Sequence, residues 1–395
     1  MRVLVVSHLY PYPGVDRHLF VHEQCLALRG LGVEMHVISP TPWIPRVLWS
    51  SSRMRRRGSK PPRAVRDGIV ADYPRFPQLP RRLFFDRLGD LAYRRVRGLP
   101  AVSGVRYDLI HAHQALPDGA VAAHLSRDLG VPYLVTVHGA DVNRGLEGAG
   151  PVARRTAEVL EGAAAVVAVS GVLARRLTAR VPLDAVHVVQ NGVPAGLHGV
   201  QPSDYLPGHR VVLAAGRLVA GKGFEHVLEA LARLAAGRDD LRGVVAGEGA
   251  LRRRLEALAA ELGLADRVAL PGRLEHEDLL AMMARADVFA LPSAPEGFGL
   301  VHLEAMTQGT PVVGCLDQGP ADFIEDGVSG HLVPYGDVAA LTRALAATLD
   351  DPERARVVGE AGRKVAETFT WERNAHRMVE LYERCASAAR PAGAA

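Results

Sequence analysis

The sequence predicts an α/β protein made of two doubly wound, Rossmann-like domains, each built on a parallel sheet. Two observations support this fold class. Short apolar runs of four to six residues alternate along the chain with longer segments of helical periodicity, which is typical of parallel strands covered by helices on both faces. In addition, 395 residues exceed the length at which one hydrophobic core stops growing, so two domains are expected.

The first half of the chain contains six expected strands with helical segments between several of them. The strands are expected at residues 3–7, 34–39, 109–112, 133–137, 166–169 and 186–190. The helices are expected at residues 19–29, 120–128, 154–161 and 172–180. Parallel strands need crossover connections, which are usually helices, so this alternation indicates a first doubly wound domain.

A stretch rich in glycine and proline, residues 191–208, separates this domain from a second one. The alternation restarts with expected strands at residues 211–215, 243–246, 267–270, 288–291, 311–314 and 330–333. We place the boundary near residue 197, which gives domains of residues 1–197 and 198–370. In the remaining segment, 371–395, we expect a helix over 371–389 that returns to the first domain, followed by a disordered tail.

The composition excludes several classes of protein. Cys25, Cys315 and Cys385 lie far apart and form no CxxC spacing, which favours a reducing compartment. No apolar run approaches the roughly 20 residues that span a bilayer, and the first one is too short for a secretory signal. We therefore expect a cytoplasmic protein.

Residues 43–75 break the alternation, because aromatic residues, prolines and a basic cluster are mixed there without a period. We expect a long, partly disordered loop in this segment. Between Arg46 and Arg97, 15 Arg or Lys face four Asp, a net charge of +11, whereas the rest of the chain has a net charge of −7. This basic segment, residues 46–97, could be a solvated surface, dock on anionic lipid through aromatic anchors, or bind an anionic acceptor. It matches no nucleic-acid-binding module, so nucleic acid is not an expected partner.

The first chemical motif runs from Gly216 to Gly223, between an expected strand and a helix that should begin near Phe224. Glycine-rich loops at helix starts bind phosphate with backbone amides. Gly223 stands where Walker loops have the Ser or Thr that holds magnesium, so this is not a Walker loop. Arg217 and Lys222 instead suggest a metal-free clamp on a diphosphate. The alternative is a glycine-rich turn with two solvated cations.

The second motif places Glu296 and Glu304 eight residues apart, just after the expected strand at 288–291. Glu296 should lie in a turn and Glu304 about one and a half turns into a helix that begins near Phe298 or Gly299. Both carboxylates could then face one crevice, with backbone amides of the helix start directed at an anion. The alternative is one solvated loop carboxylate and one charge on a helix surface.

Together these segments resemble the family 4 retaining glycosyltransferases of the GT-B fold. The segments AGRLVAGKGFEHVLEA and, some 75 residues later, LPSAPEGFGLVHLEAMTQGTPVV match the two signature segments of that family. Shorter matching pieces follow in the expected order: Pro13-Gly14, Asp108 to His113, Thr136 to Gly139, Val169-Ser170, Asn191-Gly192, Gly247 to Gly249, and Asp326 to Val333. The resemblance covers nearly the whole chain and is weakest over residues 43–107 and the tail.

The resemblance implies that the second domain binds a nucleotide-diphosphate sugar and the first an acceptor. Arg217 and Lys222 should bind the diphosphate, and Glu304 the ribose hydroxyls. Glu296 should lie near the sugar, together with the amides of Gly297, Phe298, Gly299 and Leu300. The segment Gly272-Arg273-Leu274 should lie beside the nucleobase. From the first domain, His138 should approach the sugar, and Gly14 should let the first loop come close to the phosphate or the sugar.

The implied reaction is retaining glycosyl transfer in glycan, glycolipid or secondary-metabolite biosynthesis, and the sequence does not identify the acceptor. No side chain suggests a nucleophile for double displacement, so the resemblance favours attack on the face from which the phosphate leaves. His138, Glu296, Arg217 and Lys222 would then act by positioning and charge. No D-x-D motif occurs in the chain, so we expect neither a metal nor another cofactor.

Other functions remain open. A nucleotide-sugar 2-epimerase has the same fold, and so does a phosphorylase, although the latter is longer and needs a pyridoxal-binding lysine that we do not find. A non-catalytic nucleotide-sugar binding protein is a third alternative. His111 and His113 alternate near a strand end without a third metal ligand, so we expect histidines of the core or cleft.

Overall fold

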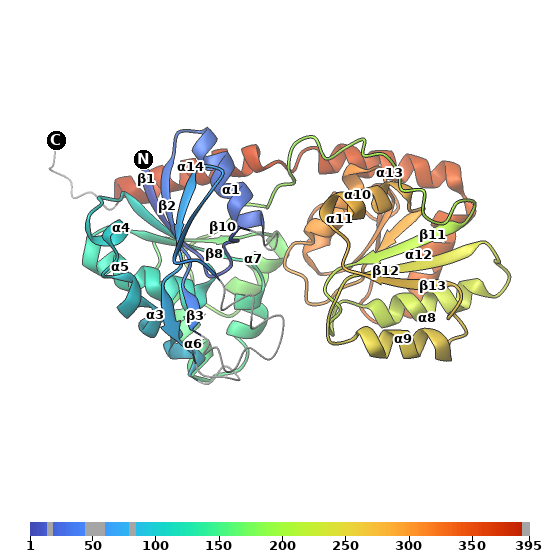
Figure 1. Cartoon of the computed structure of the whole chain (residues 1–395), viewed down its shortest axis with the longest axis horizontal. Helices are drawn as coiled ribbons and strands as arrows, with labels where there is room; N and C mark the ends of the chain where they lie inside the picture. Colours follow the sequence, from blue (N-terminus) through green and yellow to red (C-terminus); the bar gives the residue numbers. More distant parts are fainter. Residues whose placement is uncertain (14–18, 44–59, 79–83, 389–395) are drawn as a thin grey trace. The chain divides into compact units, whose positions relative to one another are not determined.

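The structure is a computed structural model that describes residues 1–13, 19–43, 60–78 and 84–388 (Figure 1). The chain divides into two compact units, each with its own parallel sheet. Unit 1 consists of Met1–Gly192 and Trp371–Ala395, and unit 2 consists of Val193–Thr370. Within the described residues, no helix combines the length and the apolar character needed to cross a bilayer.

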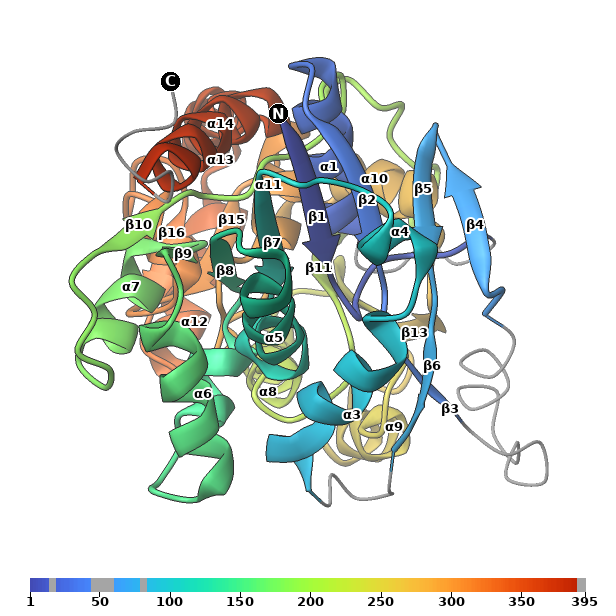
Figure 2. The ribbon, with the colours of Figure 1, turned by 90° about the vertical axis from the view of Figure 1, so that its left-hand side faces the viewer.

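The main sheet of unit 1 has eight strands in the order β10-β9-β8-β7-β1-β2-β5-β4, with β4 at one edge and β10 at the other (Figure 2). All neighbours are parallel except β4 and β5. The bounds are β1 Arg2–Val6, β2 Glu34–Ile38, β4 Arg63–Arg66, β5 Ile69–Asp72, β7 Leu109–His113, β8 Tyr133–Val137, β9 Ala165–Ala168 and β10 Val186–Val188. A separate pair consists of β3 Thr41–Trp43 and β6 Arg75–Pro77.

Helices cover both faces of this sheet, which explains why its central strands are continuous apolar runs (Figure 1). The helices α1 and α14 pack together, whereas α3 packs on α5. The helix bounds are α1 Leu19–Gly30, α3 Leu88–Val96, α4 Pro100–Ser103, α5 Ala120–Leu129, α6 Pro151–Glu161, α7 Gly171–Thr178 and α14 Trp371–Ala388. Single 3₁₀ or π turns occur at Phe85–Arg87, Ala115–Gly119 and Asp141–Gly145.

The last helix, α14, completes the core of unit 1. Met378 and Tyr382 are fully buried in a cluster that also contains residues of β1 and α1. Two polar contacts fix the helix: Gln24 donates to Asn374 at 2.7 Å, and Tyr382 Oη lies 2.7 Å from His111 Nδ1. The unit is therefore assembled from both ends of the chain. The expected disordered tail, residues 389–395, lies outside the described residues.

The expectation of an irregular loop over residues 43–75 is wrong for its second part. There β4 and β5 form an antiparallel hairpin that extends the sheet beside β2, and β6 follows. The turn is Asp67-Gly68, with φ of 46° and 75°, and an Asp-Gly pair with positive φ is a strong hairpin signal. The charged residues around the turn concealed the short alternation of Ile69 and Ala71, which are buried. Residues 44–59 of this segment lie outside the described residues.

Unit 2 has a six-stranded parallel sheet in the order β13-β12-β11-β14-β15-β16. The bounds are β11 Arg210–Ala215, β12 Leu241–Ala246, β13 Val268–Gly272, β14 Val288–Ala290, β15 Val312–Cys315 and β16 His331–Val333. The helices are α8 Phe224–Ala235, α9 Arg252–Glu261, α10 His276–Arg285, α11 Leu300–Thr307, α12 Val338–Asp350 and α13 Pro352–Ala366, with a 3₁₀ turn at Gly319–Asp322. The helices of unit 2 form two groups, one of α8, α9 and α12 and the other of α10, α11 and α13 (Figure 1). Each unit thus has a sheet with two groups of helices, which confirms the doubly wound α/β class.

The contact between Tyr382 and His111 gives a first prediction. Tyr382→Phe removes the hydroxyl from a buried pair and leaves His111 Nδ1 without its partner, so the free energy of unfolding of unit 1 should fall by about 1–3 kcal/mol. Urea unfolding followed by tryptophan fluorescence reports on unit 1, because Trp43, Trp49 and Trp371 all lie in its two segments.

The matched control is Tyr93→Phe, which removes an exposed hydrogen bond to Asp128 that water can replace. That variant should stay within about 0.5 kcal/mol of the parent. An equal loss in both variants would contradict a specific role for the buried pair.

Candidate active site

The strand order of unit 2 reverses between β11 and β14, which are neighbours at the centre of the sheet. In doubly wound sheets, ligands bind outside the carboxyl ends of the strands at such a reversal. The loops that follow these two strands, residues 216–223 and 291–299, contact each other there. Gly221 and Gly223 have φ of +86° and +76°, and a Cβ on them would lie 2.7 Å from Ala294 O and 2.5 Å from Pro292 O, respectively. Glycine is thus required for the close approach of the two loops.

A lysine and a carboxylate join the two loops. Lys222 Nζ lies 2.6 Å from Glu296 Oε2, and Ser293 Oγ donates to the same oxygen at 3.0 Å. The loop after β15 holds the backbone of Glu296: Gln318 Oε1 accepts from its N–H at 2.9 Å, and Gly319 N–H donates to its carbonyl at 3.1 Å. The loops that follow three strands, β11, β14 and β15, therefore bring together the two predicted residues Lys222 and Glu296.

This environment decides the charge of Glu296. Burial raises the pKa of its carboxyl group, but the charge and hydrogen bond of Lys222 outweigh burial, so the pKa lies below its ordinary value. Glu296 is therefore a carboxylate at neutral pH, which accepts hydrogen bonds and has no proton to donate. Lys222 uses one of its three N–H donors on Glu296 and keeps two for an anion.

The other predicted donor-binding residues lie at the same ends of the strands. Arg217 follows β11 and is exposed, and its side chain makes no hydrogen bond or ion pair within the part of the chain that the structure describes. Gly272 ends β13, and its carbonyl accepts from Gly247 N–H at 2.7 Å, which ties it to the loop after β12. Arg273 is exposed and Leu274 is half-buried just beyond it.

The helix after the Glu296 turn begins slightly later than predicted. It starts at Leu300, with Gly299 as its N-cap at φ +96°, so the turn that presents Gly297 and Phe298 is longer by one or two residues. Glu304 is in this helix, α11, and its Oε1 lies 3.3 Å from His276 Nε2 at the start of α10. The predicted helix near Phe224 does begin there.

The strand order of unit 1 reverses in the same way, between β1 and β7. Beyond these strands and the adjacent β8, the structure collects His8, Asp118, His138 and Asp141. His8 Nδ1 lies 2.8 Å from Asp118 Oδ2, and Asp141 accepts from His138 N–H at 3.1 Å. His138 Nε2 lies 3.1 Å from Nδ1 of His113, which is buried as expected of a core histidine. Of the predicted residues in this unit, Gly14 lies outside the described residues.

Comparisons with known proteins agree with this geometry. The profile of "Glycosyltransferase Family 4" matches residues 14–196, and that of "Glycosyl transferases group 1" matches residues 203–365. The D-inositol 3-phosphate glycosyltransferase of Thermobispora bispora is 34% identical over 302 residues, which cover 70% of each chain. The chain belongs to glycosyltransferase family 4.

Other relatives match over a shorter length. An MMP alpha-(1->4)-mannosyltransferase from Mycolicibacterium hassiacum is 37% identical over 204 residues, which cover 51% of this chain and 49% of that protein. The chain therefore matches about half the length of that relative. The alpha-D-kanosaminyltransferase of Streptomyces kanamyceticus is 35% identical over 173 residues, which cover 44% of this chain and 45% of that protein.

Two solved structures show the fold. A sucrose-phosphate synthase from Thermosynechococcus elongatus has a TM-score of 0.83 at 24% identity, covering 98% of this chain and 99% of that one. Anabaena HepE in complex with UDP-glucose has a TM-score of 0.73 at 20% identity, covering 97% of this chain and all of that one. The GT-B fold expected from the sequence is thus confirmed for this glycosyltransferase.

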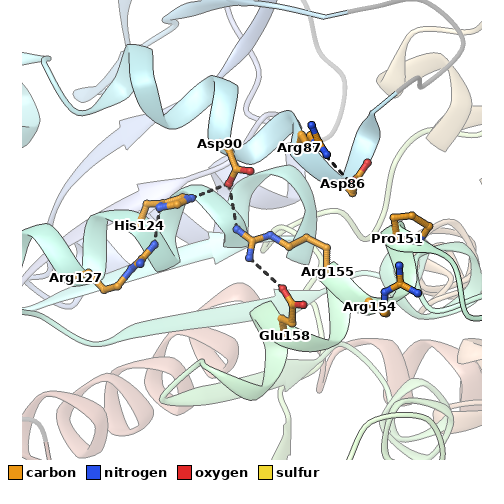
Figure 3. Close-up of a pocket in the computed structure, with 9 residues that line it drawn as sticks. All are labelled: Asp86, Arg87, Asp90, His124, Arg127, Pro151, Arg154, Arg155 and Glu158. Carbon is orange, nitrogen blue, oxygen red and sulfur yellow. Dashed lines mark hydrogen bonds and ion pairs between the residues drawn. The ribbon is translucent and has the colours of Figure 1, made fainter.

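A hollow of about 410 Å³ between α3, α5 and α6 of the glycosyltransferase contains none of the predicted site residues (Figure 3). Several of its charged side chains pair with one another. Asp90 Oδ1 accepts from His124 at 2.7 Å and from Arg155 at 3.1 Å, and Arg155 also contacts Glu158 at 3.1 Å. The side chains are partly exposed, so this is a solvated network of ion pairs rather than an anion site.

Sequence reasoning missed several residues that shape the two sites. In unit 2 it missed Gln318 and His302, and in unit 1 it missed His8, Asp118 and Asp141. All but His302 follow the carboxyl end of a strand, which is the signal that could have found them. His302 is fully buried in α11 below the Glu296 turn, and its Nε2–H donates to Leu291 O at 3.1 Å.

His302 gives a prediction about the pH dependence of stability. Burial lowers its pKa to about 4, whereas the imidazole of the unfolded chain takes up a proton near pH 6.5. The unfolded state therefore binds more protons between these values, and unit 2 should lose up to about 3 kcal/mol as the pH falls from 6.5 to 4. Calorimetric unfolding at pH 7.5 and 4.5 measures this change.

His302→Gln should remove most of the pH slope between these values, because the amide keeps a donor for Leu291 and does not titrate. His198→Gln, at an exposed position of the same unit, is the matched control and should keep the parental slope. A parental slope in His302→Gln would show that another group causes it.

Proposed function

We propose that this glycosyltransferase moves a sugar from a nucleotide-diphosphate donor to a hydroxyl of an acceptor, with retention of the anomeric configuration. The contact between Lys222 and Glu296 at the reversal of strand order in unit 2 is the observation that supports it most. It places a cation for a diphosphate and a permanent carboxylate for sugar hydroxyls within one hydrogen bond of each other.

The donor would bind along the carboxyl ends of the strands of unit 2. Arg217 and Lys222 would bind the diphosphate, with the amides of the turn before α11 beside them. The ribose and the base would bind farther along the same ends of the strands. The residues there are Glu304, Gly272, Arg273 and Leu274. In unit 1, His138 would contact the sugar.

The reaction would be driven by charge stabilisation and positioning. Two fixed cations stabilise the diphosphate as the bond to the anomeric carbon breaks, so no metal ion is needed in this proposal. The diphosphate then takes the proton of the acceptor hydroxyl whose oxygen bonds to that carbon on the same face. Glu296 remains a carboxylate throughout and orients the sugar.

We propose a polyhydroxylated acceptor, with a cyclitol as the first candidate. Two relatives match this chain over 70% or more of their own length. Their names are "D-inositol 3-phosphate glycosyltransferase" and "2-deoxystreptamine glucosyltransferase". Both names specify a six-membered carbocycle with several hydroxyl groups. The acceptor panel is therefore myo-inositol, D-inositol 3-phosphate and 2-deoxystreptamine.

The donor prediction is tested by thermal unfolding with UDP- and GDP-sugars, with and without EDTA. At 100 times its dissociation constant, a specific donor should add about 2.7 kcal/mol of stability. Arg217→Ala should weaken this donor by about 10- to 100-fold, because a charge-assisted contact to the diphosphate is lost. Arg253→Ala, at an exposed position of α9, is the matched control and should bind as the parent does.

Stabilisation that vanishes in EDTA and returns with magnesium would contradict metal independence. Unchanged donor binding in Arg217→Ala would contradict the phosphate clamp. Conversion of the donor to its 2-epimer without an acceptor would favour the epimerase, and donor binding without any turnover would favour a binding protein. The anomeric configuration of the product, measured by NMR, tests retention.

We also propose that the basic segment of residues 46–97 contacts anionic lipid. Trp43 and Phe84, just before and within the segment, are 51% and 58% exposed, as interfacial anchors require, whereas Phe85 is half-buried. Ile44, Leu48 and Trp49 lie outside the described residues.

Flotation with vesicles of phosphatidylserine and phosphatidylcholine at low salt should recover the protein, and vesicles of phosphatidylcholine alone should not. Phe84→Ala together with Arg87→Ala should reduce recovery several-fold, and salt should weaken it because the attraction is screened. Equal recovery with both kinds of vesicle, or none with either, would contradict an electrostatic contact.

A further inference from the structure

We propose that His8 is an acceptor-binding residue, whose Nε2 accepts a hydrogen bond from a hydroxyl group of a polyhydroxylated acceptor while Asp118 holds its ring. This inference rests on the proposed glycosyl transfer. It assigns a role to a pair of residues that lie 110 positions apart in the sequence and meet at the carboxyl ends of β1 and β7.

Both carboxylate oxygens of Asp118 contact His8. Its Oδ1 accepts from the backbone N–H of His8 at 3.0 Å, and its Oδ2 lies 2.8 Å from His8 Nδ1. The Asp118 side chain has no exposed surface, and burial raises the pKa of its carboxyl group, against the opposing charge and hydrogen bonds of His8. A fully buried carboxylate is expensive to maintain, so its use in fixing one partly exposed imidazole points to a function of that imidazole.

The Asp118 contact decides what His8 can do. With Nδ1–H donating to the carboxylate, the ring in its neutral form presents Nε2 with a lone pair as a hydrogen-bond acceptor. The side chain of His8 is 30% exposed, and its Nε2 has no hydrogen-bond partner among the described residues. A ligand hydroxyl can therefore reach an acceptor atom that the protein orients and does not use.

Two buried polar atoms beside His8 also lack partners in the described part of the chain. Ser7 Oγ belongs to the preceding residue, and His113 Nε2 belongs to the last residue of β7. Both residues are at most 1% exposed. Buried polar atoms are normally satisfied, so these two unpaired atoms leave hydrogen-bonding capacity at this end of the sheet.

The same end of unit 1 contains the predicted sugar contact. Asp141 accepts from the backbone of His138 and of Ala115. Burial raises the pKa of Asp141 to about 6, and His8 lies near enough to oppose that shift when its ring is protonated. His8 thus belongs to the site of His138, where an acceptor would have to lie for transfer.

The surrounding charges favour a hydroxyl over an anion. Asp118 and Asp141 are carboxyl groups that lie close to His8, and Lys60 is a more distant cation whose charge acts on Asp118. These two acidic groups would repel a phosphate or carboxylate of a ligand, whereas a neutral hydroxyl can donate to the lone pair of His8 Nε2. We assign His8 to a non-reacting hydroxyl, so no bond forms or breaks at the ring, and the proton of the reacting hydroxyl leaves with the diphosphate.

The test uses His8→Asn in the full chain, because the shorter amide can still donate to Asp118 and removes the Nε2 atom. Steady-state kinetics with the members of the cyclitol panel that the parent glycosylates should show the acceptor KM raised about 10- to 100-fold. The dissociation constant of the donor and the thermal midpoint should stay near the parental values. His8→Gln, whose amide oxygen can reach the position of Nε2, should recover part of the acceptor affinity.

Deoxy derivatives of the acceptor identify the hydroxyl. Removal of the contacted hydroxyl should weaken the parent by the same factor as His8→Asn and should weaken His8→Asn no further, because both changes remove one hydrogen bond. His36→Asn is the matched control: His36 forms a similar pair with Asp72 at 2.7 Å, in the middle of β2, and its loss should leave the acceptor KM unchanged.

The outcomes separate this inference from the proposed function. An unchanged acceptor KM in His8→Asn, additive effects with every deoxy derivative, or the same loss in His36→Asn would overturn the role of His8 while the parent remains a glycosyltransferase. If the parent binds a donor but glycosylates no cyclitol of the panel, the polyhydroxylated acceptor and the role of His8 both fail. If no donor binds either, the proposed function itself fails.

Discussion

The ion pair between Lys222 and Glu296 joins the loops that follow β11 and β14, where the strand order of unit 2 reverses, and the proposed donor site depends on it. The pair requires the loops to touch, and they touch only because Gly221 and Gly223 leave room for the carbonyl groups of Ala294 and Pro292. It also cancels the effect of burial on Glu296, which would otherwise take up a proton more readily. One contact thus fixes both the geometry and the charge of the site.

Unit 1 repeats the same topology with different chemistry. The reversal in unit 2 presents guanidinium and ammonium groups, whereas the reversal in unit 1 presents imidazoles beside two buried carboxyl groups, of which Asp118 holds the ring of His8 and Asp141 the backbone of His138. A common scaffold would therefore account for the division of ligands proposed for the two halves of the chain. What distinguishes the halves is the handful of side chains that follow the strand ends, because the strands themselves are apolar and covered by helices.

The sequence predicted the parts of the fold that have a strong period and missed the parts that depend on contacts between distant residues. The central strands, helices α1 and α5 and the start of α8 were predicted within a few residues, because buried apolar runs leave a clear signal. The hairpin β4–β5 was missed, since charge concealed its alternation. The motifs assigned Lys222 and Glu296 to one donor site, although not to a direct contact, whereas nothing in the sequence brought His8 and Asp118 together, because no local pattern links residues 110 positions apart.

The return of α14 to unit 1 has a consequence for the order in which the protein can be made. Unit 2 is one continuous segment, and Val193 and Thr370 at its two ends are joined by a β-bridge, so it can close as soon as residue 370 is available. Unit 1 cannot, because Met378 and Tyr382 fill its core from the last helix. During synthesis on the ribosome, the half that begins first should therefore finish last, with the α14 side of its sheet uncovered until then.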